Sequence, residues 1–303
     1  MTAYSVACLA GDGIGPEVMA QASRALAAAG RLHRFSVEEE HVPFGADARM
    51  RVGHPFPATS RNAALTADAI LAATIDRTLL TALEAELDLR AAVLRVRLRG
   101  AAMTILAPLH PTAWEWTLER ALDAARASRG SLTLVTGEDE EAAEAVAARA
   151  HDEGLQFARL SPRGAIHSLL ARPETFDVVA CDRPLIVPLA ELAWCDDRRR
   201  VLAWGRLAEE GPSIFGPSHG TALDIAGQGV ADPSSMLLAA SLMLGEGLDE
   251  RAAARTLASA VAYVCGNGLR NGTTVPLSGE LTDAVLAQLP HSLSNAEFFT
   301  EAV

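Results

Sequence analysis

The sequence predicts an α/β protein with a largely parallel or mixed sheet. Along most of the chain, short apolar segments of strand length alternate with amphipathic segments of helix length. From Asp232 onward the pattern changes to a run of helices. With 303 residues, half of them hydrophobic, the chain is long enough to form one two-lobed unit or two modest domains.

The first strand is expected at 4–10, and the turn Gly11–Val18 then leads into a helix that ends near Ala29. The strand at 94–99 alternates leucine or valine with arginine, which places Arg95, Arg97 and Arg99 on one face. The other strands are expected at 35–42, 66–73, 103–106, 131–136 and 176–180, and the other helices at 77–87, 114–128, 139–153, 163–171, 233–246, 250–264 and 279–289.

Composition excludes several classes of partner. The formal net charge of −12 argues against nucleic acid and anionic membranes, because phosphate binding needs clustered cations. Four scattered cysteines form no C-x-x-C pair, so neither a zinc site nor a disulfide framework is indicated. The N-terminus lacks the basic region of a signal peptide, and the apolar stretch 236–244 is too short to span a membrane. These features predict a cytoplasmic protein.

The chain contains no lysine, and all 26 of its basic residues are arginine. Drift in a GC-rich genome explains such a bias on the surface. It does not explain the loss of a lysine needed for chemistry, because arginine stays protonated and cannot transfer protons near neutral pH.

Two long motifs, Leu9–Val18 and His219–Pro233, stand near the two ends of the chain in the order strand–turn–helix and glycine-rich loop. The first resembles the opening strand, turn and helix of the isopropylmalate/isocitrate dehydrogenase family, and the second is similar to that family's adenosine-binding loop. The resemblance implies a large lobe made from both chain ends, expected at 1–95 plus 205–303. It also implies a small lobe from the middle, expected at 96–204, through which two copies form a homodimer.

The resemblance implies NAD as cofactor. Asp224 stands where NAD-dependent members carry an acid for the ribose hydroxyls, and glycines allow close backbone approach. The alternative is that this loop only closes the large lobe, since Leu223 and Asp232 replace the family's proline and asparagine. The residues implied for the cofactor are Ile14, His219, Gly220, Thr221, Ala222, Asp224 and Asp232.

The family's chemistry needs a divalent metal held by carboxylates, together with a lysine and a tyrosine that transfer protons. The lysine is missing, and the chain's tyrosines, Tyr4 and Tyr263, fall in the large lobe. The positions implied for the metal acids hold Arg163, Val187 and Glu191, and one acid of three does not suit a dication. No divalent metal is therefore expected.

Histidines are the remaining acid–base candidates, and we single out His110 and His167, each of which could also be a plain surface residue.

The positions implied for substrate arginines hold Glu84 and Leu94, whereas Arg95, Arg97 and Arg163 could re-form an anion clamp. The alternative for Arg95 and Arg97 is an exposed strand edge protected by charge. Trp194 and Trp204 either make the interlobe cleft more apolar or fill the core or a dimer interface.

Three hypotheses about function stay open. The first is a repurposed, metal-independent enzyme that binds a bulkier, less charged small molecule in the interlobe cleft. The second is a non-catalytic homologue that partners an active subunit. The third is a NAD-dependent 2-hydroxy-acid dehydrogenase with a rearranged site, since a fold by itself does not define a function.

Overall fold

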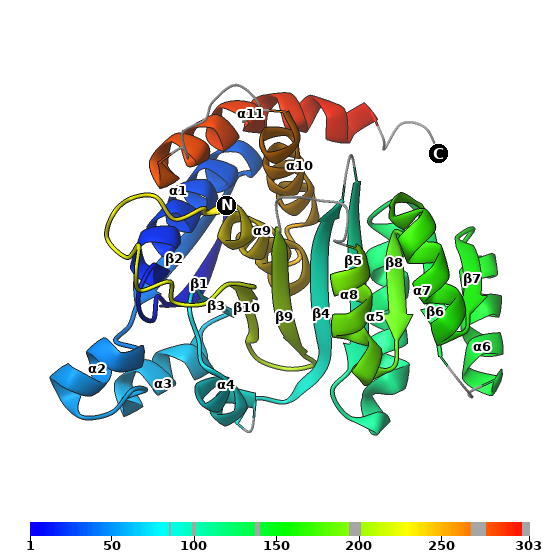
Figure 1. The fold of residues 1–303 in the computed structure, drawn as a ribbon, viewed down its shortest axis with the longest axis horizontal. Helices are drawn as coiled ribbons and strands as arrows, with labels where there is room; N and C mark the ends of the chain where they lie inside the picture. The colour runs from blue at the N-terminus through cyan, green and yellow to red at the C-terminus, as the bar shows by residue number, and fades with distance from the viewer. Residues whose placement is uncertain (85, 99–100, 137–139, 194–200, 268–276, 299–303) are drawn as a thin grey trace. The chain divides into compact units, whose positions relative to one another are not determined.

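The computed structural model describes the chain except for residues 85, 99–100, 137–139, 194–200, 268–276 and 299–303. Two compact units make up the protein (Figure 1). The first consists of Met1–Asp88 and Val201–Val303, and the second of Leu89–Arg200. The sequence reading put the boundaries at 95/96 and 204/205, a few residues further along the chain.

The sheet of the first unit has the strand order β2-β1-β3-β10-β9. All neighbours are parallel except β9 and β10, which are antiparallel. Ala69 of β3 lies opposite both Val6 of β1 and Ser213 of β10, so the three central strands end at one edge. The strands are β1 (Thr2–Leu9), β2 (Phe35–His41), β3 (Ala69–Ala72), β9 (Leu202–Ala208) and β10 (Ser213–Pro217).

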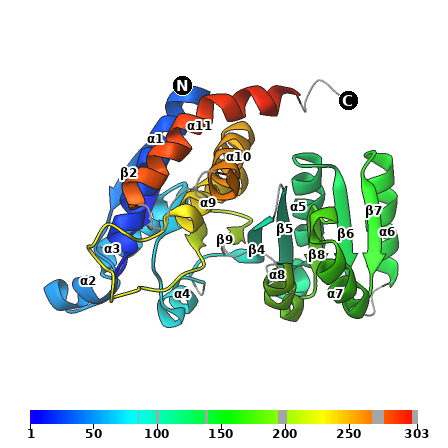
Figure 2. The same ribbon diagram turned by 45° about the horizontal axis from the view of Figure 1, so that its top comes forward.

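Helix α9 (Ser234–Leu242) lies at the centre of the first unit's helical layer. Every one of its residues is buried, because its sequence carries only small and apolar side chains and has no charged face. It contacts α1, α10, β9 and β10, and Figure 2 shows α11 running over α1 and α10. The other helices are α1 (Gly15–His33), α2 (Gly45–Val52), α3 (Ala58–Thr66), α4 (Arg77–Glu84), α10 (Arg251–Asn267) and α11 (Ser278–Phe298).

The strands of the second unit have the order β4-β5-β8-β6-β7. Strands β4 and β5 form an antiparallel hairpin, and β5, β8, β6 and β7 are parallel. The strands are β4 (Leu89–Leu98), β5 (Ala101–Pro108), β6 (Ser131–Val135), β7 (Gln156–Leu160) and β8 (Val178–Cys181), and the helices are α5 (Trp114–Arg126), α6 (Glu140–Asp152), α7 (Pro162–Ala171) and α8 (Ile186–Ala193).

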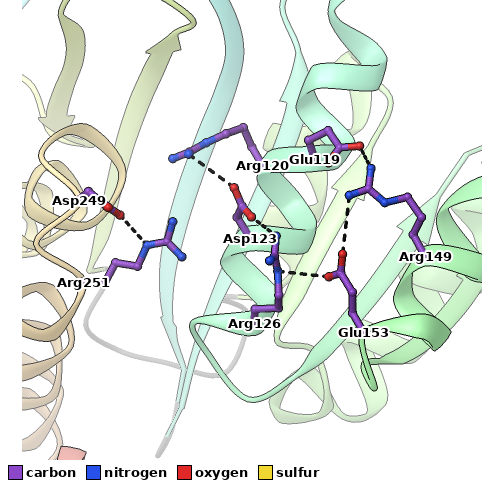
Figure 3. Close-up of polar contacts among 8 residues, drawn as sticks. All are labelled: Glu119, Arg120, Asp123, Arg126, Arg149, Glu153, Asp249 and Arg251. Atoms are coloured by element: carbon purple, nitrogen blue, oxygen red, sulfur yellow. Dashed lines mark hydrogen bonds and ion pairs between the residues drawn. The ribbon is translucent and has the colours of Figure 1, made fainter.

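Arginine ion pairs connect α5 with α6 on the surface of the second unit (Figure 3). Arg149 pairs with Glu119 and Glu153, and Arg126 pairs with Asp123 and Glu153. In the first unit Arg251 pairs with Asp249 at 2.7 Å. These side chains are partly exposed, so each pair contributes at most about 1 kcal/mol. Such surface roles account for several of the arginines.

The predicted α/β class with a mixed sheet is confirmed. Strands β7, β9 and β10 and helices α2, α3 and α8 were not predicted from the sequence. Strands β9 and β10 are interrupted by Gly205 and Gly216 and end near proline, which hides their periodicity. Strand β4 also begins earlier than expected, at Leu89 instead of 94, and Arg99 lies outside the described residues.

Candidate functional site

The turn after β1 packs against the loop after β10. The backbone N–H of Ile14 donates a hydrogen bond to the carbonyl oxygen of Thr221 at 2.8 Å. Gly13 has a φ of +62°, and a Cβ at this position would lie 1.9 Å from the same carbonyl oxygen. Glycine is therefore required here both for the backbone conformation and for the close approach of the two loops.

Thr74, which follows β3, holds the same turn from the other side. Its hydroxyl accepts a hydrogen bond from the backbone N–H of Asp12 at 2.7 Å. The carboxylate of Asp12 in turn accepts from the backbone N–H of Ala46, at 2.8 Å, in the first turn of α2. The loops after β1, β3 and β10 thus meet at the carboxyl edge of the sheet, where open α/β sheets bind ligands.

A cavity of about 330 Å³ opens beside these loops. Trp204 forms one wall; its indole N–H donates to the carbonyl oxygen of Pro217 at 2.9 Å. Gly216 lets the ring lie close, since a Cβ there would be 2.7 Å from the indole. The lining residues are Ala73, Ile75, Trp204, Pro217, Ser218, His219 and Gly220, all from the first unit.

His219 offers a buried hydrogen-bond acceptor beside this cavity. Its Nδ1 lies 3.1 Å from the carbonyl oxygen of Gly220, and because a carbonyl only accepts, Nδ1 carries the proton. Burial lowers the pKa of His219, against smaller opposing effects from Gly220 and Asp232. The ring is therefore neutral at pH 7, and Nε2 is an acceptor that no described residue hydrogen-bonds. A ligand with an N–H or O–H group would satisfy it.

Glu17, in the first turn of α1, fixes the far end of the loop 219–231, which follows β10. Its carboxylate accepts hydrogen bonds from the backbone N–H groups of Gly229, at 3.3 Å, and Ala231, at 3.0 Å, and from the Ser278 hydroxyl. Burial raises the pKa of Glu17, but these hydrogen bonds outweigh burial and leave the pKa below its usual value. The segment 219–231 is thus held at Thr221 and again at Gly229 and Ala231.

Comparison with known proteins identifies the family. The sequence profile described as "Isocitrate/isopropylmalate dehydrogenase" matches residues 5–117 and 201–285, more than half of the chain. The chain belongs to this family. The unmatched stretch between the two ranges, 118–200, lies inside the second unit.

Full-length relatives and solved structures agree with this assignment. The chain is 29% identical to 3-isopropylmalate dehydrogenase of Synechococcus sp. (90% of this chain, 94% of the relative). It is 27% identical to that of Streptococcus thermophilus (94% and 99%). A β-decarboxylating dehydrogenase from Thermococcus kodakarensis has the same fold, with a TM-score of 0.78 at 24% identity (97% and 98%). Isocitrate dehydrogenase from Methylococcus capsulatus gives 0.70 at 19% identity (94% and 99%).

The residues that this dehydrogenase family implies for NAD all fall in the first unit. Ile14 is buried, His219 and Gly220 line the cavity, and Thr221 accepts the hydrogen bond from Ile14.

Ala222 has a φ of +39°, an unusual value for a residue other than glycine. Asp224 is exposed, and Asp232 is an exposed residue whose carboxylate accepts from the N–H of Ser234 at 2.9 Å.

The catalytic and substrate candidates fall in the second unit. His110 is exposed at the carboxyl end of β5, and Arg163 and His167 are exposed one turn apart on α7. Strands β5 and β7 are separated by β8 and β6, so Arg163 lies at the same sheet edge as His110 but about 14 Å away, at 4.7–4.9 Å per strand.

The exposed-edge interpretation of the arginine strand is wrong for Arg97, which is only 5% exposed. Arg95 donates to the hydroxyl of Thr104 on the neighbouring strand at 3.3 Å. In the β4–β5 register Arg97 lies opposite Ala102, whereas His110 lies beyond Pro108. Six residues of strand separate these points by about 20 Å, so Arg97 and His110 cannot both touch one small ligand within this unit.

The positions that the family resemblance implies for the metal acids lie on two helices of the second unit. Val187 is 56% exposed on α8, Glu191 follows one turn later, and Arg163 brings a positive charge on α7. Among the described residues, the one cluster of three groups able to ligate a metal is Cys8, Glu39 and His41, in the first unit.

His219, Gly220 and Trp204 were named from the sequence, the last as a possible cleft residue, but the rest of the cavity wall was not predicted. Trp194 lies outside the described residues. Ala73, Ile75, Pro217 and Ser218 carry no chemical signal of their own. They could have been found as the residues that end or follow two neighbouring parallel strands, once β10 had been recognised.

Proposed function

We propose that the first unit binds NAD, and that the protein is a metal-independent enzyme acting on a bulkier, less charged small molecule than an isopropylmalate dehydrogenase does. The observation that carries this proposal is the cavity beside His219 and Gly220, with its buried acceptor Nε2. A buried polar atom without a partner among the described residues, beside a cavity, is typical of a ligand site.

The size of the cavity suits one half of a dinucleotide. Ligand pockets range from about 300 to 1,000 Å³, and 330 Å³ is at the lower end. Nε2 of His219 would accept from an N–H group of the ligand, and Trp204 would lie against a planar ring. Asp224, exposed on the same loop, would accept from ribose hydroxyls and repel a 2′-phosphate.

The charges around the site support a less charged substrate. Glu84 stands where the family resemblance puts a substrate arginine, and it pairs with Arg206 at 2.8 Å. The guanidinium of Arg206 also lies 5.7 Å from the centre of the Trp204 ring. Because Arg206 is already neutralised by Glu84, this part of the first unit offers little attraction to a dicarboxylate.

The chemistry that we propose uses no metal-bound intermediate. The chain has no lysine, and the positions that would hold metal acids carry Val187 and Arg163. His110, exposed at the carboxyl end of β5, is the proposed acid–base group. The side chain of Arg183 donates to the carbonyl oxygen of Leu109 and so fixes the backbone next to His110.

Titration with NAD⁺ and NADH, followed by tryptophan fluorescence, tests the cofactor. We expect a dissociation constant below about 1 mM, a signal that disappears in Trp204→Phe, and roughly tenfold weaker binding in His219→Ala. His167→Ala, in the other unit, is the control and should bind normally. Absence of binding at millimolar NAD would contradict the cofactor assignment.

A turnover assay separates the hypotheses. With a panel of small hydroxy and carbonyl compounds, turnover should persist in a chelator and be lost in His110→Ala without loss of folded structure. NADH formation from a 2-hydroxy acid that stops on chelation would favour the rearranged dehydrogenase instead. Co-purification with a second homologous chain, and no turnover with any compound, would favour the non-catalytic homologue.

We also propose that the protein forms a homodimer in the cytoplasm. Leu170 of α7 and Val187 of α8 are each 56% exposed, and the two helices pack together. An apolar surface of this kind on adjacent helices suits burial against a second copy. None of the described helices is long and apolar enough to cross a membrane. Sedimentation should give a dimer that Val187→Glu weakens.

A further inference from the structure

Cys8, Glu39 and His41 bring a thiol, a carboxylate and an imidazole together on one side of the first unit. Cys8 on β1 lies opposite His41 on the parallel strand β2, and Glu39 is two residues before His41 and so on the same face. One ligand atom from each side chain lies within 4.8 Å of the others. This group belongs neither to the cavity nor to the dehydrogenase motifs.

We propose that these three side chains form a zinc site. Thiolate, imidazole and carboxylate are the ligands that Zn²⁺ takes in proteins, at about 2.3 Å from sulfur and 2.0–2.2 Å from nitrogen or oxygen. Harder ions such as Mg²⁺ and Ca²⁺ prefer sites made of oxygen alone.

The group is close to the geometry that zinc requires. Tetrahedral ligands at those bond lengths lie roughly 3.3–3.6 Å apart, so no pair of ligand atoms must approach by more than about 1.5 Å. Nε2 of His41 is already 3.0 Å from Oε2 of Glu39. His41 is an exposed side chain and can make the remaining movement. The fourth position would be filled by water.

The surroundings hold the ligands in place. The hydroxyl of Ser23, on α1, donates to Glu39 Oε2 and fixes the carboxylate, in the way that outer hydrogen bonds orient metal ligands. Cys8 is 1% exposed, and the carbonyl oxygen of Val6, at 3.9 Å, is its weak hydrogen-bond partner. Burial, reinforced by Glu39, raises the pKa of the Cys8 thiol to about 12. Zinc binding would therefore release the thiol proton, and affinity should rise with pH.

Such a site would link β2 to β1. Strand β2 is at the edge of the first unit's sheet, and Cys8 is three residues before the Gly11–Gly15 turn. A metal bound here stabilises the folded state in proportion to the logarithm of its concentration over its dissociation constant. The site would thus hold the edge strand in register beside the turn that packs on Thr221.

Cobalt substitution tests the proposal, because a thiolate bound to Co²⁺ gives a charge-transfer band that nitrogen and oxygen ligands do not give. The full-length protein, stripped with a chelator, should bind one Co²⁺ per chain with this band, and Zn²⁺ should displace it. Zn²⁺ should also raise the thermal unfolding temperature. Cys8→Ser should abolish the band, and His41→Ala should weaken Zn²⁺ binding roughly 100-fold.

Cys265→Ser is the matched control, since Cys265 is also a buried cysteine but contacts Ser234 instead. It should keep both the band and the thermal shift. If Cys8→Ser does not fold, His41→Ala decides the matter, because His41 is exposed and its loss leaves the core intact. Absence of the thiolate band in the wild-type protein, or unchanged Zn²⁺ affinity in His41→Ala, would overturn the proposal.

Discussion

Single carboxylates hold the loops of this protein in place, and Glu17 shows how. Three hydrogen bonds from Ala231, Gly229 and Ser278 converge on it. They connect α1 to the loop after His219 and to the start of α11, which are more than 200 residues away in sequence. One side chain therefore couples the candidate cofactor loop to the packing of two helices.

Glu17→Gln should destabilise the protein at pH 7 by about 1–2 kcal/mol, because charge-assisted hydrogen bonds become neutral ones. The folded pKa of Glu17 is lowered, so its contribution is complete above the unfolded value near 4.3. That contribution is lost as the pH falls through the folded pKa. Urea unfolding of both proteins between pH 7 and pH 3 measures this loss of stability.

The wild-type and Glu17→Gln stabilities should converge in acid. The exposed Glu38→Gln is the control and should show almost no difference at any pH. A constant gap between wild type and Glu17→Gln down to pH 3 would mean that the charge of Glu17 is irrelevant.

Gly13 gives a second prediction at the residue scale. Gly13→Ala must adopt a positive φ and must also displace the carbonyl of Thr221, so we expect a loss above about 3 kcal/mol and weaker NAD binding. Gly53→Ala is the matched control. Gly53 has a φ of +79° with nothing within 4 Å, and its substitution should cost only about 1–2 kcal/mol. Equal losses in urea unfolding would show that the contact with Thr221 is unimportant.

Among the elements, the second unit depends on a buried acid that the sequence did not single out. Asp177, immediately before β8, is 2% exposed. It accepts hydrogen bonds from the Ser128 hydroxyl and from the backbone N–H of Arg129, at 2.8 Å, and of Ser131, at 3.3 Å. The carboxylate thus joins the turn between α5 and β6 to the strand that lies between β5 and β6.

Asp177→Ala should destabilise the second unit by about 3–5 kcal/mol, because it leaves several buried donors without an acceptor. Hydrogen exchange should show the loss at residues 128–135 and 176–181 first. Asp152→Ala, at an exposed position on α6, is the control and should be neutral. Unchanged exchange at β6 and β8 in Asp177→Ala would contradict this role.

Strong local patterns predicted their elements, and weak ones did not. Helix α1 follows from Gly15-Pro16 and its amphipathic repeat, and β3 follows from four apolar residues. By contrast, β10 contains Gly216, where a glycine is needed because Trp204 packs against it, which is a tertiary reason invisible in sequence. The burial of Arg97 likewise depends on packing, so alternation alone wrongly suggested an exposed edge.

Only part of the candidate site could likewise be predicted from the sequence. His219 and Gly220 could be found because they lie in a motif, whereas the wall formed by Ala73 and Ile75 depends on strand order. The cluster of Cys8, Glu39 and His41 depends on the register of β1 and β2, so the cysteine spacing alone predicted no zinc site. Site residues that lie together in one segment can be predicted from the sequence. Site residues that are brought together by the register of paired strands cannot.

At the scale of the whole molecule, each unit has its own strands and helices, and the proposed NAD loop lies in only one of them. A ligand stabilises the part of a protein that contains its site. Saturating NAD⁺ should therefore stabilise the first unit more than the second, and multi-domain chains commonly unfold in more than one step.

Tryptophan fluorescence can measure the unfolding stability of each unit separately. Trp204 reports on the first unit, and Trp114 and Trp116 report on the second. In a variant with Trp204 as its single tryptophan, NAD⁺ at 100 times its dissociation constant should raise unfolding stability by about 2.7 kcal/mol. In a variant that keeps only Trp114 and Trp116, NAD⁺ at 100 times the dissociation constant of that variant, measured by calorimetry, should move the midpoint less. Identical shifts in both variants would mean that the two units unfold as one cooperative body, and that the cofactor site stabilises the entire chain.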